Sequence, residues 1–393
     1  MDDLSPQFHF VLASDSLKGT LSSAEAEGLL EAAAHAHFPN ATCACVPMAD
    51  GGEGTVDAVV AAMGGEMRSV RVHDPLGRPV EARYGLLGSG RAIIEMAAAS
   101  GLTLLGPDER NPLRASTYGT GELISDALMQ GCTDVSLAVG GSATNDGGMG
   151  CMRALGARFL DEHGSELMGS GADLAHVRAI DVGLLRRYVA GAHFTVMCDV
   201  DNPLVGELGA TCVFAPQKGA TPQQVEELER GMARYAEVLR STFRMGVDAG
   251  APGSGAAGGL GLACVTFLGA RAQGGIDRVL DLVAFGRRLR GASLCITGEG
   301  RLDAQTSHGK VVSGVAAACQ RRGVPCVALV GVAEPNVSIA GVSAVIAVTE
   351  APELLDAASM QARLAHARRL YAHRANQLFA ALSLGRSLEA RSR

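Results

Sequence analysis

The chain has 393 residues, and its apolar content of 47% with only 19% charged residues excludes an intrinsically disordered protein. The length predicts about two domains. Basic residues number 34 and acidic residues 41, and the resulting net charge of −7 argues against a nucleic-acid partner. No apolar run is long enough to cross a membrane, and the first ten residues lack a signal-peptide core. The ten cysteines include no C-x-x-C pair, which predicts reduced thiols and a cytoplasmic location.

The predicted elements alternate along most of the chain. Strands are expected at residues 8–13, 42–46, 68–73, 80–86, 91–95, 134–139, 194–198, 294–297, 326–330 and 344–348. Ser22, with Glu25 three residues later, forms a capping box that predicts the start of the first helix. Further helices are expected at 55–63, at 120–129, from 149, from 222 to about 240, and at the C-terminal end.

Strand–loop–helix alternation is typical of a parallel sheet covered by helices, so the fold class is α/β. Two interruptions predict one discontinuous, doubly wound domain and a second, mixed α/β domain formed by two insertions. The expected boundaries are 1–67, 116–192 and 288–393 for the first domain, and 68–115 and 193–287 for the second. The D-G-G-x-G pattern at 50–54 recurs at 146–150, which predicts two similar turns at one edge of the same sheet.

The last helix carries a stripe of apolar residues from Leu364 to Leu382, and we interpret it as a cover on the main domain. Arg374 falls outside that stripe. His366 also lies on this helix and is expected to be solvated or at the edge of the core.

Several common catalytic motifs are absent. The sequence has no P-loop, because Gly309-Lys310 is followed by Val311, and it has no protein-kinase H-R-D loop, no G-x-S-x-G and no H-E-x-x-H. Residues 253–258 match G-x-G-x-x-G, but a loop-like stretch precedes them, so this is a weak indication of a dinucleotide site.

Glycine-rich turns and acidic residues nevertheless recur together. Glycine accounts for 51 residues and clusters at 50–54, 119–121, 140–150, 253–261 and 298–300, and such turns entering helices bind phosphates well. The alternative for any single turn is that glycine serves tight packing, and an isolated acid there most often caps a helix. Carboxylates, glycine turns and lysines combined are what phosphoryl transfer needs.

The lysine count supports this interpretation. Only three lysines occur, Lys18, Lys218 and Lys310, whereas the other 31 basic residues are arginine. All three lie in loops that contain glycine. A lysine retained in such a chain indicates a site that needs a compact ammonium rather than a planar guanidinium, and chance retention remains the alternative for each one taken alone.

These motifs together resemble the type I glycerate kinase family. The resemblance is carried by residues 15–19 (DSLKG), 49–55 (ADGGEGT), 118–122 (YGTGE), 140–150 (GGSATNDGGMG), 198–204 (CDVDNPL), 214–220 (FAPQKGA), 297–306 (TGEGRLDAQT) and 309–310 (GK). It departs from the family at Ser14 before Asp15 and at Cys198 before Asp199. It implies ATP-dependent phosphorylation of D-glycerate, with 2-phosphoglycerate favoured over 3-phosphoglycerate, and a Rossmann-like first domain. The expected ligands are therefore ATP, Mg²⁺ and D-glycerate, and the expected assembly is a monomer or homodimer.

The resemblance implies roles for individual residues of this chain. The expected catalytic residues are Asp199 as the base, Lys18 and Asp146. The expected substrate-binding residues are Asp15, Ser16, Gly140, Gly141, Ser142 and Asn145. The expected ATP-phosphate ligands are Gly255, Gly258, Gly259, Lys218 and Lys310. The expected metal ligands are Glu299 and Asp303, with Asp50 in reserve.

Two other classes of function are weighed against this one. An NAD(P)-dependent oxidoreductase acting on a small hydroxy acid would depend on residues 253–258 alone. A non-catalytic binding protein with two lobes would not need so many acids beside glycine turns. An assay for ADP from ATP and D-glycerate separates the three.

Overall fold

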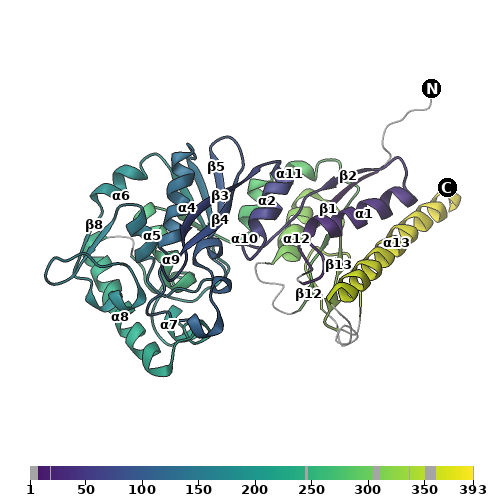
Figure 1. The fold of residues 1–393 in the computed structure, drawn as a ribbon. Helices are drawn as coiled ribbons and strands as arrows, with labels where there is room; N and C mark the ends of the chain where they lie inside the picture. The colour runs from purple at the N-terminus through teal and green to yellow at the C-terminus, as the bar shows by residue number, and fades with distance from the viewer. Residues whose placement is uncertain are drawn as a thin grey trace. The chain divides into compact units, whose positions relative to one another are not determined.

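The computed structural model describes residues 8–17, 19–243, 247–303, 310–335, 337–349 and 360–392. The chain divides into two compact units, each with its own mixture of helices and strands (Figure 1). Unit 1 comprises Met1–Asp50, Ala61–Met63 and Ile276–Arg393, and unit 2 comprises Gly51–Val60 and Gly64–Gly275. The prediction of an α/β protein with a discontinuous first domain is confirmed.

Unit 1 is built on a five-stranded, fully parallel sheet in the order β15-β13-β11-β1-β2. Its strands are β1 (His9–Ser14), β2 (Thr42–Cys45), β11 (Leu294–Gly298), β13 (Cys326–Val330) and β15 (Ala344–Ala347), with a short pair β12 (Arg301–Leu302) and β14 (Val332–Ala333). Its helices are α1 (Ser23–His37), α10 (Gly275–Leu282, which starts at the last residue of unit 2), α11 (Phe285–Arg288), α12 (Val311–Arg322) and α13 (Met360–Ser392).

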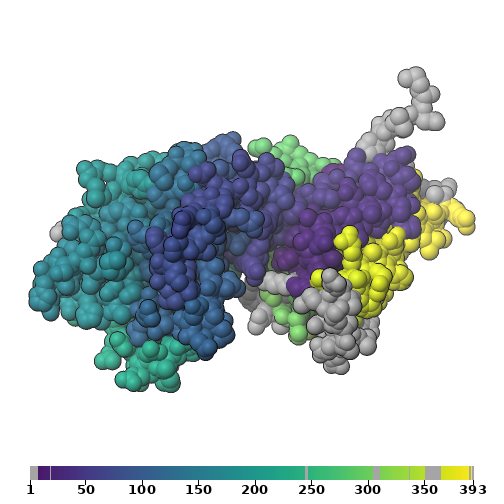
Figure 2. Space-filling model, in the orientation of Figure 1, coloured from purple at the N-terminus to yellow at the C-terminus, as the bar shows by residue number. Residues whose placement is uncertain are grey.

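The central strands of this sheet are buried on both sides because helices cover both of its faces. On one face α1 and α13 pack side by side, as the purple and yellow atoms of Figure 2 show. There Phe379 of α13 contacts Phe10 of β1, with ring centroids 5.2 Å apart. On the other face α12 packs on β11 and β13. The predicted capping box starts α1, since Ser22 Oγ accepts from the Glu25 N–H and the Glu25 carboxylate accepts from the Ser22 N–H.

Unit 2 contains a six-stranded mixed sheet in the order β10-β9-β6-β5-β4-β3. Its strands are β3 (Glu66–His73), β4 (Pro79–Leu86), β5 (Arg91–Glu95), β6 (Asp134–Ala138), β9 (His193–Met197) and β10 (Arg271–Gln273), with a separate pair β7 (Arg158–Leu160) and β8 (Ala179–Asp181). Its α-helices are α2 (Thr55–Met63, which ends in unit 1), α3 (Ala97–Ser100), α4 (Tyr118–Met129), α5 (Met149–Ala154), α6 (Gly183–Tyr188), α7 (Ala210–Phe214), α8 (Pro222–Phe243) and α9 (Leu260–Leu268). Short 3₁₀ helices are η1 (Leu102–Leu104), η2 (Pro107–Glu109), η3 (Gly171–His176), η4 (Pro216–Lys218) and η5 (Ala256–Gly259).

The two units differ from the predicted domains chiefly in one long segment, and residues 51–60, 64–67 and 276–287 also fall in the other unit than predicted. Residues 116–192 were expected in the doubly wound domain, but β6 pairs with β5 on one side and β9 on the other, so this segment belongs to unit 2. The same pairing places the two D-G-G-x-G turns after strands of different sheets, which corrects the expectation of one shared edge. Local pattern identifies a buried parallel strand but does not say which sheet it joins.

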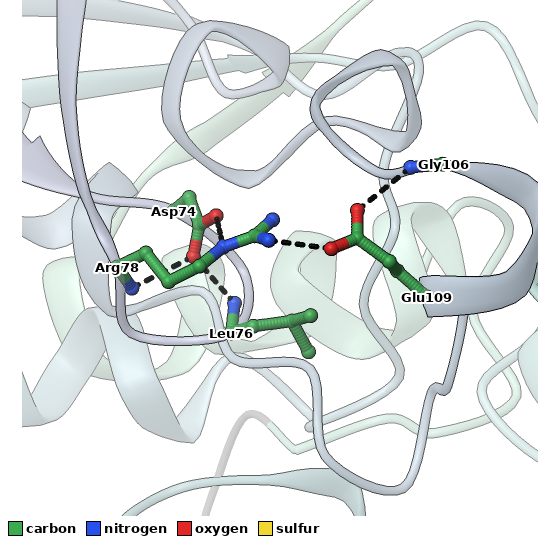
Figure 3. Close-up of polar contacts among 5 residues, drawn as sticks. All are labelled: Asp74, Leu76, Arg78, Gly106 and Glu109. Carbon is green, nitrogen blue, oxygen red and sulfur yellow. Dashed lines mark hydrogen bonds and ion pairs between the residues drawn. The ribbon is translucent and has the colours of Figure 1, made fainter.

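A polar network ties the turn between β3 and β4 to the segment that follows β5 (Figure 3). Asp74 is buried, and its Oδ1 accepts from the N–H groups of Leu76 and Arg78. The Arg78 side chain binds Asp74 Oδ2 at 2.6 Å and Glu109 Oε1 at 2.5 Å, and Glu109 accepts from the Gly106 N–H. Because both carboxylates share one guanidinium, the turn and η2 are held together.

Within the described part of the chain, no helix is long and apolar enough to cross a membrane.

Candidate active site

A cavity of about 880 Å³ lies at the carboxyl edge of the unit 1 sheet. Parallel strands end at one edge, and ligands of doubly wound folds bind there. Asp15 and Ser16 follow β1, Glu299 follows β11, and Asp50 lies five residues after β2. The structure therefore brings together residues that the sequence assigned to substrate and to metal.

The first turn of this edge is held by backbone and side-chain hydrogen bonds. The Asp15 N–H donates to the Gly298 carbonyl at 2.8 Å, and Asp15 Oδ1 accepts from the Ser16 N–H at 2.6 Å. Asp15 and Glu299 are buried, with relative exposures of 8% and 5%, and Ser16 is half-buried. Two buried carboxylates at the wall of a cavity are suited to a bound cation.

Lys310 lies at the same cavity, immediately before α12. Its Nζ lies 3.5 Å from Asp303 Oδ1, and the side chain is about one-third exposed. An ammonium beside a helix N-terminus favours an anion such as a phosphate. Lys18, the other lysine predicted near this edge, lies outside the described residues.

The predicted metal ligands do not form a tight group of three. In the part of the chain that the structure describes, only two trios of metal-ligating side chains have donor atoms within 4.8 Å of one another, and neither includes Glu299, Asp303 or Asp50. Mg²⁺ does not require such a cage, since it usually keeps several waters and uses one or two carboxylates plus substrate phosphates. Asp15, Asp50 and Glu299 at the cavity fit that mode of binding.

The apolar part of the cavity wall comes partly from α13. Ala367 and Leu370 line it together with Val332 and Val348. His366 and Arg374 of the same helix also line it, and the sequence predicts neither as a site residue. The 366–370–374 spacing repeats every four residues on one helix face, and this was the available signal. Arg301, also in the wall, carries an ion pair with Glu334 at 3.1 Å.

In unit 2, Asp146 is fully buried and both its oxygens accept hydrogen bonds. Oδ2 accepts from the N–H and the hydroxyl of Thr117 and from the Gly150 N–H, and Oδ1 accepts from the Gly148 N–H. Burial raises the pKa of Asp146, and these hydrogen bonds oppose the shift. This geometry favours a structural anchor for the start of α5 over a catalytic acid or base.

Lys218, predicted to hold phosphates, is buried against the 140–145 loop. Its Nζ donates to Ser142 Oγ at 2.8 Å and to the Thr144 carbonyl at 2.7 Å. Burial lowers the pKa of Lys218 to about 7, partly offset by the charge of Asp146. These contacts account for the lysine without a phosphate.

Asp199 is exposed and follows β9. Its Oδ1 accepts from the Gly275 N–H at 2.8 Å, which fixes the carboxylate without burying it. Asn145 is fully buried, and its amide donates to Thr211 Oγ1 at 3.1 Å. Asn145 carries an amide and cannot act as a base. Asp199 has the accessible carboxylate that a general base requires.

The glycines of the 255–259 turn are used for close packing. A Cβ on Gly258 would lie 2.3 Å from the Thr144 carbonyl oxygen, and one on Gly255 would lie 2.2 Å from that of Pro203. Gly259 packs on Gly147. Among the described residues, α8 is the element before this turn and no strand leads into it, so the dinucleotide motif lacks its structural context.

Gly140 and Gly141 line a smaller hollow of about 260 Å³ in unit 2. Glu53 and Glu95 line it as well. Two carboxylates disfavour an anionic ligand, so the hollow gives no support for a carboxylate subsite at these glycines.

Comparison with known proteins agrees with this geometry. Residues 10–383 match the model of the glycerate kinase family. A glycerate kinase of Halalkalibacterium halodurans is 45% identical over 82% of this chain and 84% of its own length. Glycerate 2-kinase of Escherichia coli K12 is 42% identical over 88% of this chain and 92% of its own. A crystal structure from Salmonella typhimurium LT2, assigned to glycerate kinase 2, superimposes with a TM-score of 0.88 at 40% identity, covering 97% of this chain and 99% of that one. The chain therefore belongs to the glycerate kinase family, and it is a kinase that phosphorylates glycerate.

Proposed function

We propose that the chain transfers the terminal phosphate of ATP to the C2 hydroxyl of D-glycerate, with Mg²⁺ as the cofactor. The choice of C2 is supported by the Escherichia coli relative, which is called a glycerate 2-kinase. The observation that supports ATP as the phosphate donor is the cavity of unit 1. Its volume of about 880 Å³ lies in the ~300–1,000 Å³ range of sites for drug-sized ligands, and a three-carbon acid would leave most of it empty.

The cavity wall matches the two ends of a nucleotide. Lys310 at the start of α12 and the guanidinium of Arg301 supply positive charge for the phosphates. The apolar side chains of Val332, Val348 and Leu370 supply a surface on which a purine can pack. Bound Mg²⁺ would neutralise charge on the phosphates, and Asp15, Asp50 and Glu299 are the carboxylates that would hold it.

Asp199 stays the proposed base for the attacking hydroxyl. Its exposed carboxylate, fixed by the Gly275 N–H, can accept a proton without first breaking a buried network. Lys18 and Ser16 remain proposed contacts of glycerate. Asp15, predicted as a third contact, is reassigned to Mg²⁺, because its buried carboxylate lies at the cavity wall together with Glu299. The NAD(P)-dependent alternative is not carried forward, because the glycines at 253–258 are used for packing.

A direct test mixes the full chain with D-glycerate, ATP and Mg²⁺, follows ADP, and identifies the product by phosphorus NMR. We expect 2-phosphoglycerate, and we expect excess chelator to stop turnover until Mg²⁺ is added back. Formation of 3-phosphoglycerate would overturn the choice of hydroxyl, and full turnover in chelator would overturn the metal.

The nucleotide cavity has its own test. Ala367→Trp fills the cavity wall on α13 and should raise KM for ATP at least about tenfold while KM for D-glycerate stays within about twofold. Ala380→Trp, at an exposed position of the same helix, is the matched control and should change neither. An unchanged KM for ATP in Ala367→Trp would place the nucleotide elsewhere.

A further inference from the structure

A second group of metal-ligating side chains lies away from the cavity, where α1 packs on β2. The strand β2 is at the edge of the unit 1 sheet and pairs only with β1 among the described strands. Cys43 and Cys45 are two residues apart on it, so their side chains share one face of the sheet. Both pack against the core that includes α1. Glu31 and His35 are four residues apart on α1, so they are neighbours on one helix face.

These side chains converge. A carboxylate oxygen of Glu31, a ring nitrogen of His35 and the Sγ of Cys43 all lie within 4.8 Å of one another. Cys45 lies two residues from Cys43 on the same strand, but its Sγ is not among the atoms of this group of three. His35 is exposed and Glu31 and Cys43 are half-buried, so a dissolved ion can reach the group.

The donor set selects the kind of ion. Thiolate sulfur and imidazole nitrogen do not suit Mg²⁺ or Ca²⁺, which take oxygen ligands. One carboxylate, one imidazole and one thiolate, with a water in the fourth position, match tetrahedral Zn²⁺, whose ligand bonds are about 2.0–2.3 Å long. We propose that Glu31, His35 and Cys43 bind one Zn²⁺ ion between α1 and the edge strand β2, with a water as the fourth ligand. The ion would cross-link a helix to a strand that is paired on one side, and it would stabilise unit 1 without taking part in phosphoryl transfer.

The other trio of ligands in the described chain provides an internal comparison. Cys295, Cys319 and Cys326 also lie within 4.8 Å of one another, but all three are fully buried and they offer thiols alone. A site there would be closed to solvent and would lack the mixed donors of the α1–β2 group.

The test uses the full chain, reduced and freed of metal by a chelator. Zn²⁺ is titrated against a chromophoric chelator, and Co²⁺ is bound in parallel. We expect one equivalent of Zn²⁺ with sub-micromolar affinity, and a tetrahedral Co²⁺ spectrum with sulfur-to-metal charge transfer. Cys43→Ser and His35→Gln should each weaken binding at least about 100-fold. The matched controls are His37→Gln, two residues further along α1, and Cys212→Ser, a half-buried cysteine of α7, and both should bind as the wild type.

Three results would overturn the proposal: no equivalent bound at micromolar Zn²⁺, binding unchanged in Cys43→Ser and His35→Gln, or binding abolished by Cys319→Ala instead. Mg²⁺-dependent glycerate phosphorylation and the circular dichroism of Cys43→Ser show whether that variant is folded. If it is not, Glu31→Gln and His35→Gln carry the test. Zn²⁺ should raise the melting temperature of the wild type and leave that of His35→Gln unchanged.

Discussion

The Nζ of Lys218 donates a hydrogen bond of 2.8 Å to Ser142 Oγ within unit 2, and Lys218 is buried whereas Ser142 is half-buried. The same ammonium reaches the Thr144 carbonyl at 2.7 Å. A residue of η4 thereby holds the 140–145 loop, which carries a large part of the resemblance to the family. The position of that loop depends on a side chain more than 70 residues further along the chain.

Replacing Lys218 should therefore cost stability. Lys218→Met keeps much of the side-chain volume and leaves the Ser142 and Thr144 oxygens without this donor. We expect the free energy of unfolding to fall by about 1–3 kcal/mol, measured by urea denaturation. Arg368→Lys is the control, because Arg368 makes only an exposed ion pair with Glu25, and its unfolding should be unchanged. An undiminished stability in Lys218→Met would show that the two hydrogen bonds contribute little.

The low pKa of Lys218 makes this effect depend on pH. Burial lowers it to about 7 in the folded chain, against 10.5 for an unperturbed lysine. Between these values the unfolded chain binds a proton that the folded chain does not, so the residue adds stability as pH rises. Below pH 7 both states are protonated and the contribution stays at its minimum. The stability difference between wild type and Lys218→Met should therefore grow from pH 7 to about pH 10, as denaturation at several pH values would show; a constant difference would contradict this.

Asp199→Asn should separate catalysis from folding. The amide oxygen can still accept from the Gly275 N–H, so the turn after β9 keeps its hydrogen bond. The amide cannot take a proton, and we expect kcat to fall by about 10²–10⁴-fold. The free energy of unfolding should change by less than about 0.5 kcal/mol. Asp201→Asn, also exposed, should keep its rate. A near-normal rate in Asp199→Asn would move the base to another residue.

The lysines of unit 1 should not tolerate arginine. Lys310→Arg keeps the charge and can still pair with Asp303, but it replaces a compact ammonium with a longer planar group. We expect kcat/KM to fall at least about tenfold, or about 1.4 kcal/mol, with little change in stability. The same is expected of Lys18→Arg. Steady-state kinetics that match the wild type for both variants would show that neither site needs a lysine.

Two glycine substitutions should have opposite effects. Gly258 has φ of +65°, and an added Cβ would lie 2.3 Å from the Thr144 carbonyl oxygen, so Gly258→Ala should destabilise by about 1–3 kcal/mol. Gly28 lies in α1 with open space around it, so Gly28→Ala should stabilise by about 0.5–1 kcal/mol. Thermal unfolding of both variants checks this. A specific loss of ATP affinity in Gly258→Ala at normal stability would instead restore the predicted phosphate role.

Local sequence determined the helices and strands, and it determined which acidic residues of the candidate site follow the strands of unit 1. Alternation of apolar strands, glycine turns and capped helices predicts parallel strands, and parallel strands carry Asp15 and Glu299 to one edge whatever the details of packing. The capping box at Ser22, helix α2 and the strands β5 and β13 follow from neighbouring residues alone. For the same reason the motifs were sufficient to recognise the family.

Only the tertiary structure decided what depends on residues distant in the chain. The pairing of β6 with β5 and β9 assigns residues 116–192 to unit 2, because strand pairing is non-local. The burial of Lys218 depends on a loop more than 70 residues away. His366 and Arg374 reach the cavity because Tyr371 and Phe379 of α13 pack into the core beside β1, and the sequence pattern showed that apolar stripe but not the surface it would cover. Such contacts are set by the free energy of burying whole faces, which no short stretch of sequence contains.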